Sequence, residues 1–247
     1  MIIKKFFTKS VLYFFLFFCF SSLSLDENQK EEKKFIQKNY KFIKYLIQKK
    51  KYKKAIFYIR NKFNIDPIFP TSKKFRVILV YLHYKNSDFI STKKSCEEFI
   101  KFYPESEYTD YILYMKGLSN IQMQKKNSQS FFQIYKNDCD NSYFKIAFSN
   151  FSQVSFNKKG KYFKNSIKIL HFLKEKIAKK ELLIVKYYFK IFADVAVIKR
   201  SEQILKNFPS TQSAYKCLFY MKKSYKRLKL KDQKNKIEKI IYNNRVN

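Results

Sequence analysis

Apolar and polar positions alternate along most of the chain with the period of an α-helix. Residues three or four apart share one face of a helix, so each such segment carries an apolar stripe along one side. Residues 72–85 carry the stripe at Phe75, Ile78, Leu79 and Leu82, and residues 88–103 carry it at Cys96, Phe99, Ile100 and Tyr103. No segment alternates convincingly with a period of two. The sequence therefore predicts an all-α fold.

Three times an apolar stretch meets a proline that is followed closely by a hydroxyl residue. These boundaries are Pro70-Thr71-Ser72, Pro104-Glu105-Ser106 and Pro209-Ser210-Thr211. Proline cannot continue a helix, and Ser or Thr beyond it can accept hydrogen bonds from the first free amides of the next helix. The first two prolines are 34 residues apart, the period of a tetratricopeptide helix–turn–helix, and the later intervals are longer. The pattern is typical of an irregular tetratricopeptide-repeat solenoid.

About ten helices in about five hairpins are expected within a repeat domain at 35–247, which follows a charged linker at 25–34. The polar segment 125–141 has no sustained helical pattern and is predicted to be a loop inserted in the third hairpin. Gly117, one of only two glycines, lies inside a predicted helix and indicates close contact with a neighbour. The expected helices are residues 35–49, 52–63, 72–85, 88–103, one that begins at 106, one through 144–154, a long one at 162–192 with a candidate break at 179–180, and 194–208, 211–228 and 231–242.

The first residues predict a secretory signal peptide at 1–24. A basic cluster precedes an apolar run at 11–20, which is shorter than the ~20 residues of a membrane span. Ser22-Leu23-Ser24 suits an ordinary signal peptidase. Cys19, with Leu16 three residues before it, offers a lipoprotein signal instead, although Phe18 stands where a small residue is expected. A lipid anchor at Cys19 and an ordinary place for Cys19 in the apolar run both stay open.

The formal charge of +34, from 53 basic and 19 acidic residues, raises nucleic acid or an anionic membrane as a partner. The composition offers a simpler cause, because 28 Phe, 20 Tyr, no Trp and 2 Gly are what AT-rich codons supply. The lysines are dispersed along the chain, and a secreted protein meets little nucleic acid. A solvated basic surface is favoured over a nucleic-acid site, and such a surface can also lie near anionic lipid head groups.

No constellation for catalysis or metal binding emerges. Cys96, Cys139 and Cys217 follow the signal peptide at unrelated spacings; Cys96 and Cys217 occupy apolar helical positions, and Cys139 lies in the polar insertion. His83 and His171 lie beside apolar residues without a spaced carboxylate or cysteine partner, and two glycines cannot make a phosphate loop. We predict a non-enzyme that needs no cofactor or metal.

The segment FYPESEYTDYILYMKGL at 102–118 resembles the BamD family of outer-membrane protein assembly lipoproteins. Further segments follow in the family's order and extend the resemblance over most of the chain from about residue 81. They are FFQIYKNDCD at 131–140, AFSNF at 147–151, FLKEKIAKKE at 172–181, KYYFK at 186–190, VAVIKR at 195–200 and FPSTQ at 208–212. A phenylalanine doublet in an inserted loop followed by AFSNF makes the match specific.

This resemblance implies a five-repeat scaffold at the periplasmic face of the outer membrane, on its inner leaflet. It implies binding to the POTRA modules of a BamA-type insertase, receipt of unfolded outer-membrane β-barrel proteins, and accessory Bam lipoproteins in many bacteria. The carboxy-terminal repeats face the insertase in the family, so the segment with Val197, Lys199 and Arg200 is the expected partner interface. Phe192 and Asp194 depart from the Gly and Trp that the family tends to have.

Two other function classes compete with this interpretation. Another periplasmic tetratricopeptide adaptor, for cell-envelope or pilus assembly, fits the same fold and signal. A basic RNA-binding helical protein fits the charge, but the predicted signal peptide argues against it.

Overall fold

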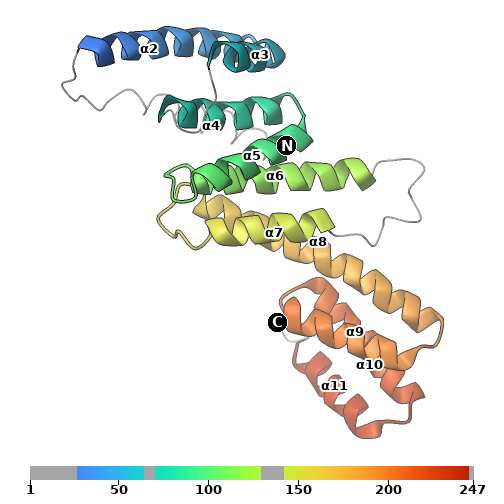
Figure 1. The fold of residues 1–247 in the computed structure, drawn as a ribbon. Coiled ribbons are helices and arrows are strands. Elements are labelled where there is room, and N and C mark those ends of the chain that lie inside the picture. Colours follow the sequence, from blue (N-terminus) through green and yellow to red (C-terminus); the bar gives the residue numbers. More distant parts are fainter. Residues whose placement is uncertain (1–26, 64–69, 129–141, 245–247) are drawn as a thin grey trace. The chain divides into compact units, whose positions relative to one another are not determined.

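The computed structural model describes residues 27–63, 70–128 and 142–244 (Figure 1). These residues form ten α-helices and no strand, which confirms the all-α prediction. The predicted signal peptide, Cys19 and Cys139 lie outside the described residues. The helices are α2 (Glu27–Gln48), α3 (Tyr52–Lys62), α4 (Pro70–Lys85), α5 (Phe89–Phe102), α6 (Thr109–Ser128), α7 (Ser142–Val154), α8 (Phe163–Lys190), α9 (Asp194–Asn207), α10 (Gln212–Arg227) and α11 (Lys231–Asn243).

The chain divides into two compact units, residues 1–50 and residues 51–247. The described part of the first unit is helix α2. This helix begins at Glu27, so most of the segment expected as a linker at 25–34 is helical. Glutamate and lysine are good helix formers, which explains why a charged stretch without an apolar stripe still continues the helix.

The second unit is a run of helices in which each packs against the next along the chain, as expected of a tetratricopeptide-type solenoid (Figure 1). Contacts between alternate helices, α4 with α6 and α8 with α10, join neighbouring hairpins. The hairpins within this unit are α4–α5, α6–α7, α8–α9 and α10–α11.

Several predicted boundaries shift. Pro70 is the first residue of α4, where a missing N–H costs nothing, so this proline begins its helix and does not precede a cap. Thr211 caps α10 as expected, because its hydroxyl accepts from the Ala214 N–H at 3.1 Å. Helix α8 continues through the lysine pair at 179–180 without a break. Residues 125–128 of the predicted inserted loop belong to α6, and residues 129–141 lie outside the described part.

The core between α6, α7 and α8 explains why Gly117 lies within a helix. A Cβ atom at Gly117 would lie 2.7 Å from two ring carbons of Phe151, which is completely buried. Tyr114 packs edge-on against the Phe151 ring at 5.5 Å and stacks on Tyr162 at 4.9 Å. Only a residue without a side chain lets α6 and α7 approach around this ring, so the predicted close contact is confirmed.

The turns within three hairpins share one backbone geometry. Ser87, Phe192 and Lys229 have φ of 59°, 59° and 61°, the left-handed region that glycine favours. In each turn the next residue's N–H reaches back five residues, as in Asp88 N to His83 O at 3.0 Å and Ala193 N to Tyr188 O at 3.0 Å. These bonds satisfy the last carbonyls of the first helix and aim the second helix back along it.

Candidate partner-binding surface

Helix α9 is fixed by its buried side between α8 and α10. Its buried residues are Asp194, Val197, Ser201 and Ile204. Val197 and Ile204 share an apolar cluster with Leu182 and Val185 of α8 and with Ala214 and Cys217 of α10. The remaining side of α9 is therefore presented to solvent on a rigid support.

The structure separates the three residues predicted as a partner interface. Val197 has no exposed surface and belongs to the core cluster, so a partner cannot reach its side chain, and this part of the prediction is corrected. The helical period explains the correction, because Val197 lies on the side of α9 that carries Ile204. Lys199 and Arg200 are both exposed. Arg200 Nη1 donates to Gln203 Oε1 at 3.5 Å, a long contact that leaves the guanidinium free to rearrange.

Three exposed apolar side chains lie next to these basic residues in the chain. Ile191 is 53% exposed, Phe192 74% and Val195 58%. We call Ile191, Phe192, Val195, Lys199 and Arg200 the α9 surface. An exposed apolar group beside basic side chains is typical of a protein-binding site. Sequence reasoning missed its apolar half, although Val195 falls outside the buried stripe of α9 and could have been found by that signal.

Arg227, from the last turn of α10, holds the turn that carries this apolar group. Its guanidinium carbon lies 4.0 Å from the ring centre of Phe189 and 5.0 Å from that of Phe192. Its Nη2 lies 3.0 Å from Oδ1 of Asp194, whose side chain is 9% exposed. The two atoms are not aligned as a hydrogen bond, so charge attraction dominates this pair. The packing of a cation between two rings orients Phe192 and the start of α9.

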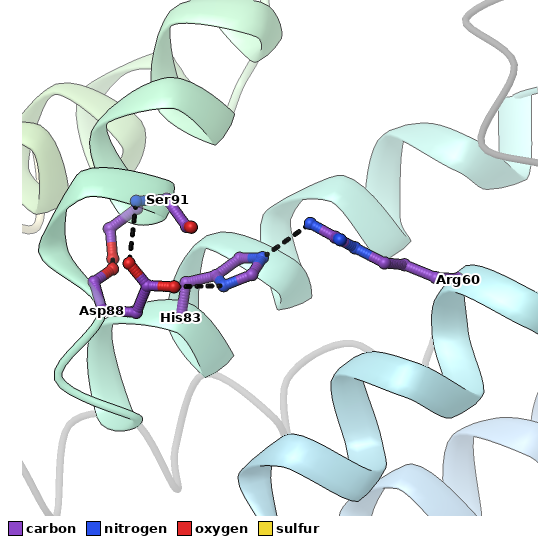
Figure 2. A network of polar contacts seen from close by, with 5 residues as sticks. Arg60, His83, Asp88 and Ser91 are labelled. Carbon is purple, nitrogen blue, oxygen red and sulfur yellow. Dashed lines mark hydrogen bonds and ion pairs between the residues drawn. The ribbon is translucent and has the colours of Figure 1, made fainter.

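A second polar cluster surrounds His83 at the end of α4 (Figure 2). Its Nε2 lies 3.4 Å from Nη2 of Arg60 on α3, and its Nδ1 lies 3.9 Å from Oδ2 of Asp88. Asp88 caps α5 by accepting from the Ser91 N–H at 3.0 Å. We expected no carboxylate partner for His83, and this was wrong: the tight turn after α4 brings Asp88, five residues later, to the imidazole.

The surroundings of His83 favour a structural role over acid–base catalysis. Burial lowers its pKa below the ordinary value of 6.5, the Arg60 charge lowers it further, and the Asp88 charge opposes both. Because Arg60 faces Nε2 and Asp88 faces Nδ1, no hydroxyl or thiol is positioned for activation among the groups in contact. The cluster joins α3 to the α4–α5 turn.

The two cysteines within the described residues have the predicted places. Cys96 and Cys217 are completely buried free thiols, and burial raises the pKa of both. Within residues 27–63, 70–128 and 142–244, no three His, Cys, Asp or Glu side chains gather as metal ligands would. In the same ranges, none of the helices combines the length and apolar character that a membrane crossing requires.

Comparison with known proteins identifies the family. The family model described as "YfiO: Outer membrane lipoprotein" matches residues 32–240, which include α8, α9 and α10 completely. The chain belongs to this family. Proteins of several other bacteria that carry the name outer membrane protein assembly factor BamD are similar to this chain, and three of them show the extent of the similarity. The protein of Buchnera aphidicola is 34% identical over 181 residues, 71% of this chain and 72% of the relative. The protein of Pasteurella multocida is 32% identical over 203 residues, which are 81% of this chain and 77% of the relative. The protein of Haemophilus influenzae is 29% identical over 196 residues, which are 79% of this chain and 75% of the relative.

Membership of this family gives meaning to the departure at Phe192. The resemblance led us to expect glycine there, and the backbone of Phe192 has the left-handed conformation that glycine adopts most easily. Phe192 therefore adopts the left-handed conformation although it is not glycine. Its side chain adds an exposed ring to the α9 surface.

Proposed function

We propose that the chain is a non-catalytic scaffold subunit of the outer-membrane β-barrel assembly machinery. In this role it binds the POTRA modules of the insertase and helps deliver unfolded outer-membrane proteins for insertion. The observation that carries the proposal is the family match over residues 32–240, together with the assembly-factor names of the relatives.

The α9 surface is the proposed contact with the insertase. Its exposed apolar residues supply area that loses water on binding, and Lys199 and Arg200 can pair with carboxylates on the partner. The buried side of α9 is anchored by the core, so the helix loses little conformational entropy when a partner binds.

Binding to the purified POTRA modules tests this proposal. We would measure the affinity of the chain from residue 25 by calorimetry at ~150 mM salt, where the Debye length of about 8 Å screens loose attraction. Arg200→Glu is expected to weaken binding by about tenfold or more, since a charge pair at an interface turns repulsive. Lys168→Glu, an exposed residue on α8 with the same change of charge, serves as the matched control and should bind almost as the parent does.

Two results would overturn the proposal at different levels. Equal affinities for Arg200→Glu and the parent chain would remove Arg200 from the interface. A well-folded helical chain that binds no POTRA module would remove the insertase as partner and favour a general envelope adaptor.

Export and anchoring are part of the same proposal. We infer that residues 1–24 are a secretion signal and that the mature chain works at the periplasmic face of the outer membrane. Mass spectrometry of the protein from its native host distinguishes the two routes. Cleavage after Ser24 gives an unmodified amino terminus at Leu25, whereas a lipid anchor gives an acylated Cys19. A chain that keeps residues 1–24 would contradict export.

A further inference from the structure

The charge of the chain is distributed unevenly around helix α2. Between Glu32 and Asp66 the sequence has twelve Lys and Arg residues and neither Asp nor Glu. Within α2 the acidic residues are confined to the first part, where their negative charges interact favourably with the positive end of the helix dipole. From Lys33 to the end of the helix every charged residue is a lysine. The electrostatic potential around this part of α2 is therefore positive.

One side of the same helix carries exposed aromatic rings. Phe35 is 46% exposed, Phe42 44% and Tyr45 47%. With Lys38 they occupy positions 35, 38, 42 and 45, a spacing of three and four that places them along one stripe. The rings of Phe42 and Tyr45 lie 6.5 Å apart, centre to centre, and are inclined by 25°.

The adjoining side of α2 is shielded from solvent at Asn39, Ile43 and Leu46, which are 4%, 0% and 5% exposed. Lys38 and Lys41 are exposed. The partly exposed aromatic rings and the exposed lysine side chains thus lie together beside the shielded side of the helix. We call Phe35, Lys38, Lys41, Phe42 and Tyr45 the α2 surface.

We propose that the α2 surface binds the surface of a bilayer that contains anionic phospholipids. Aromatic rings insert at the depth of the head groups, and lysines on the same helix attract the anionic head groups. Such helices lie in the plane of the interface, so this binding needs neither a membrane-spanning segment nor an acylated cysteine. It also goes beyond the assembly role proposed above, because it involves no contact with the insertase.

The side chains favour lipid over an acidic protein or a nucleic acid as the occupant. Arginine is the residue suited to fork-like recognition of carboxylates and phosphates, and α2 contains none. Lysine acts as a mobile point charge, which suits a fluid layer of head groups without fixed positions. The lysines attract the helix to the anionic head groups at long range, and the phenylalanine rings insert among them at short range.

Vesicle binding tests the proposal on the unlipidated chain from residue 25. We would measure partition at ~150 mM salt into vesicles with 30 mol% phosphatidylglycerol in phosphatidylethanolamine, and into pure phosphatidylcholine vesicles. Binding should occur to the anionic vesicles and be weaker by about tenfold or more on phosphatidylcholine. Lys38→Glu/Lys41→Glu should reduce partition into anionic vesicles by about tenfold or more, since each lysine near such a surface contributes about fivefold. Phe35→Ser/Phe42→Ser should weaken binding even where charge attraction remains.

A matched pair on another helix keeps the test specific. Lys236→Glu/Lys239→Glu makes the same charge change at two exposed positions of α11 and should change partition by less than about threefold. Circular dichroism is used to select folded variants. Equal losses for the α2 and α11 pairs would overturn the proposal, because net charge alone would then explain binding. Tight binding to poly-glutamate or RNA, with none to anionic vesicles, would overturn the proposal that lipid is the occupant.

The affinity of the same variants for POTRA modules is measured in lipid-free solution. This measurement tests the assembly role without lipid, so failure of the lipid proposal can be distinguished from failure of the assembly role.

Discussion

The α4–α5 turn and the α8–α9 turn have the same backbone and are held by different side chains. Each has a non-glycine residue near φ 59°, Ser87 in one and Phe192 in the other. In the first turn Asp88 caps α5 through the Ser91 N–H at 3.0 Å, a contact within four residues of chain. In the second, the N-cap position makes no side-chain bond, and Asp194 pairs with Arg227 from the next hairpin. One geometry is thus secured locally and the other by tertiary contact.

The two turns differ in how much of the structure is affected when the stabilising side chain is lost. Loss of a cap exposes a helix terminus, whose amides can turn to water. Loss of Asp194 leaves a charged guanidinium, 27% exposed at its side chain, between two rings without its partner. Because Arg227 belongs to α10, such a loss also loosens the contact between two hairpins and the support of the α9 surface.

The largest effect is expected from Asp194→Ala. The partly buried ion pair is broken and Arg227 is left unpaired, so the free energy of unfolding should fall by about 2 kcal/mol. Urea denaturation followed by circular dichroism measures this loss. Glu202→Ala, at an exposed position on the same helix, is the control and should change stability by less than about 0.5 kcal/mol. A cost no greater than that of Asp88→Ala would contradict the difference between the two turns.

The next effect is that of Asp88→Ala, which removes the cap of α5. We expect a loss of about 1 kcal/mol, the usual value of an N-cap, in the same urea experiment. Asp88→Ser keeps a hydroxyl acceptor for the Ser91 N–H and should recover most of the loss. If Ser and Ala variants are equally unstable, the stabilisation comes from the charge of Asp88 beside His83 and not from the cap.

Glycine at the left-handed positions should stabilise the protein by smaller amounts. Ser87→Gly relieves the conformational cost and is expected to add about 0.5–1 kcal/mol. Phe192→Gly relieves the same cost but loses the ring that packs on Arg227, so it should add less. Melting temperatures of the two variants check this order. A greater gain at Phe192 than at Ser87 would show that the ring contributes nothing to the second turn.

The smallest effect concerns pH and only the first turn. The pKa of buried His83 is lowered below 6.5 in the folded protein, so the unfolded chain binds the proton more readily. Stability contributed by neutral His83 is complete above pH 6.5 and falls as the pH drops through the folded pKa. His83→Gln should flatten the dependence of unfolding free energy on pH below 6.5 relative to the parent chain. Parallel curves for the two proteins would show that His83 does not couple this turn to pH.

Much of the fold follows from local sequence. Apolar residues at helical spacing predicted the helices of the second unit, and Thr211 caps α10 as the proline–hydroxyl boundary indicated. Gly117 was recognised as a close-packing site because glycine is costly inside a helix and scarce in this chain. Helix ends were less predictable, as at Glu27 and Pro70, because helix-forming charged residues and a first-turn proline give weak signals about where a helix starts.

The site depended on the tertiary structure. The segment with Val197, Lys199 and Arg200 was found by resemblance, but the packing of α9 against α8 and α10 decided that Val197 is buried and that the other two are exposed. His83 and Asp88 met through a turn, and Asp194 met Arg227 from another hairpin. The sequence by itself determined which segments are helices, because that depends on neighbours three and four residues away. Which side chains meet across hairpins was decided only by the packing of helices distant in the chain.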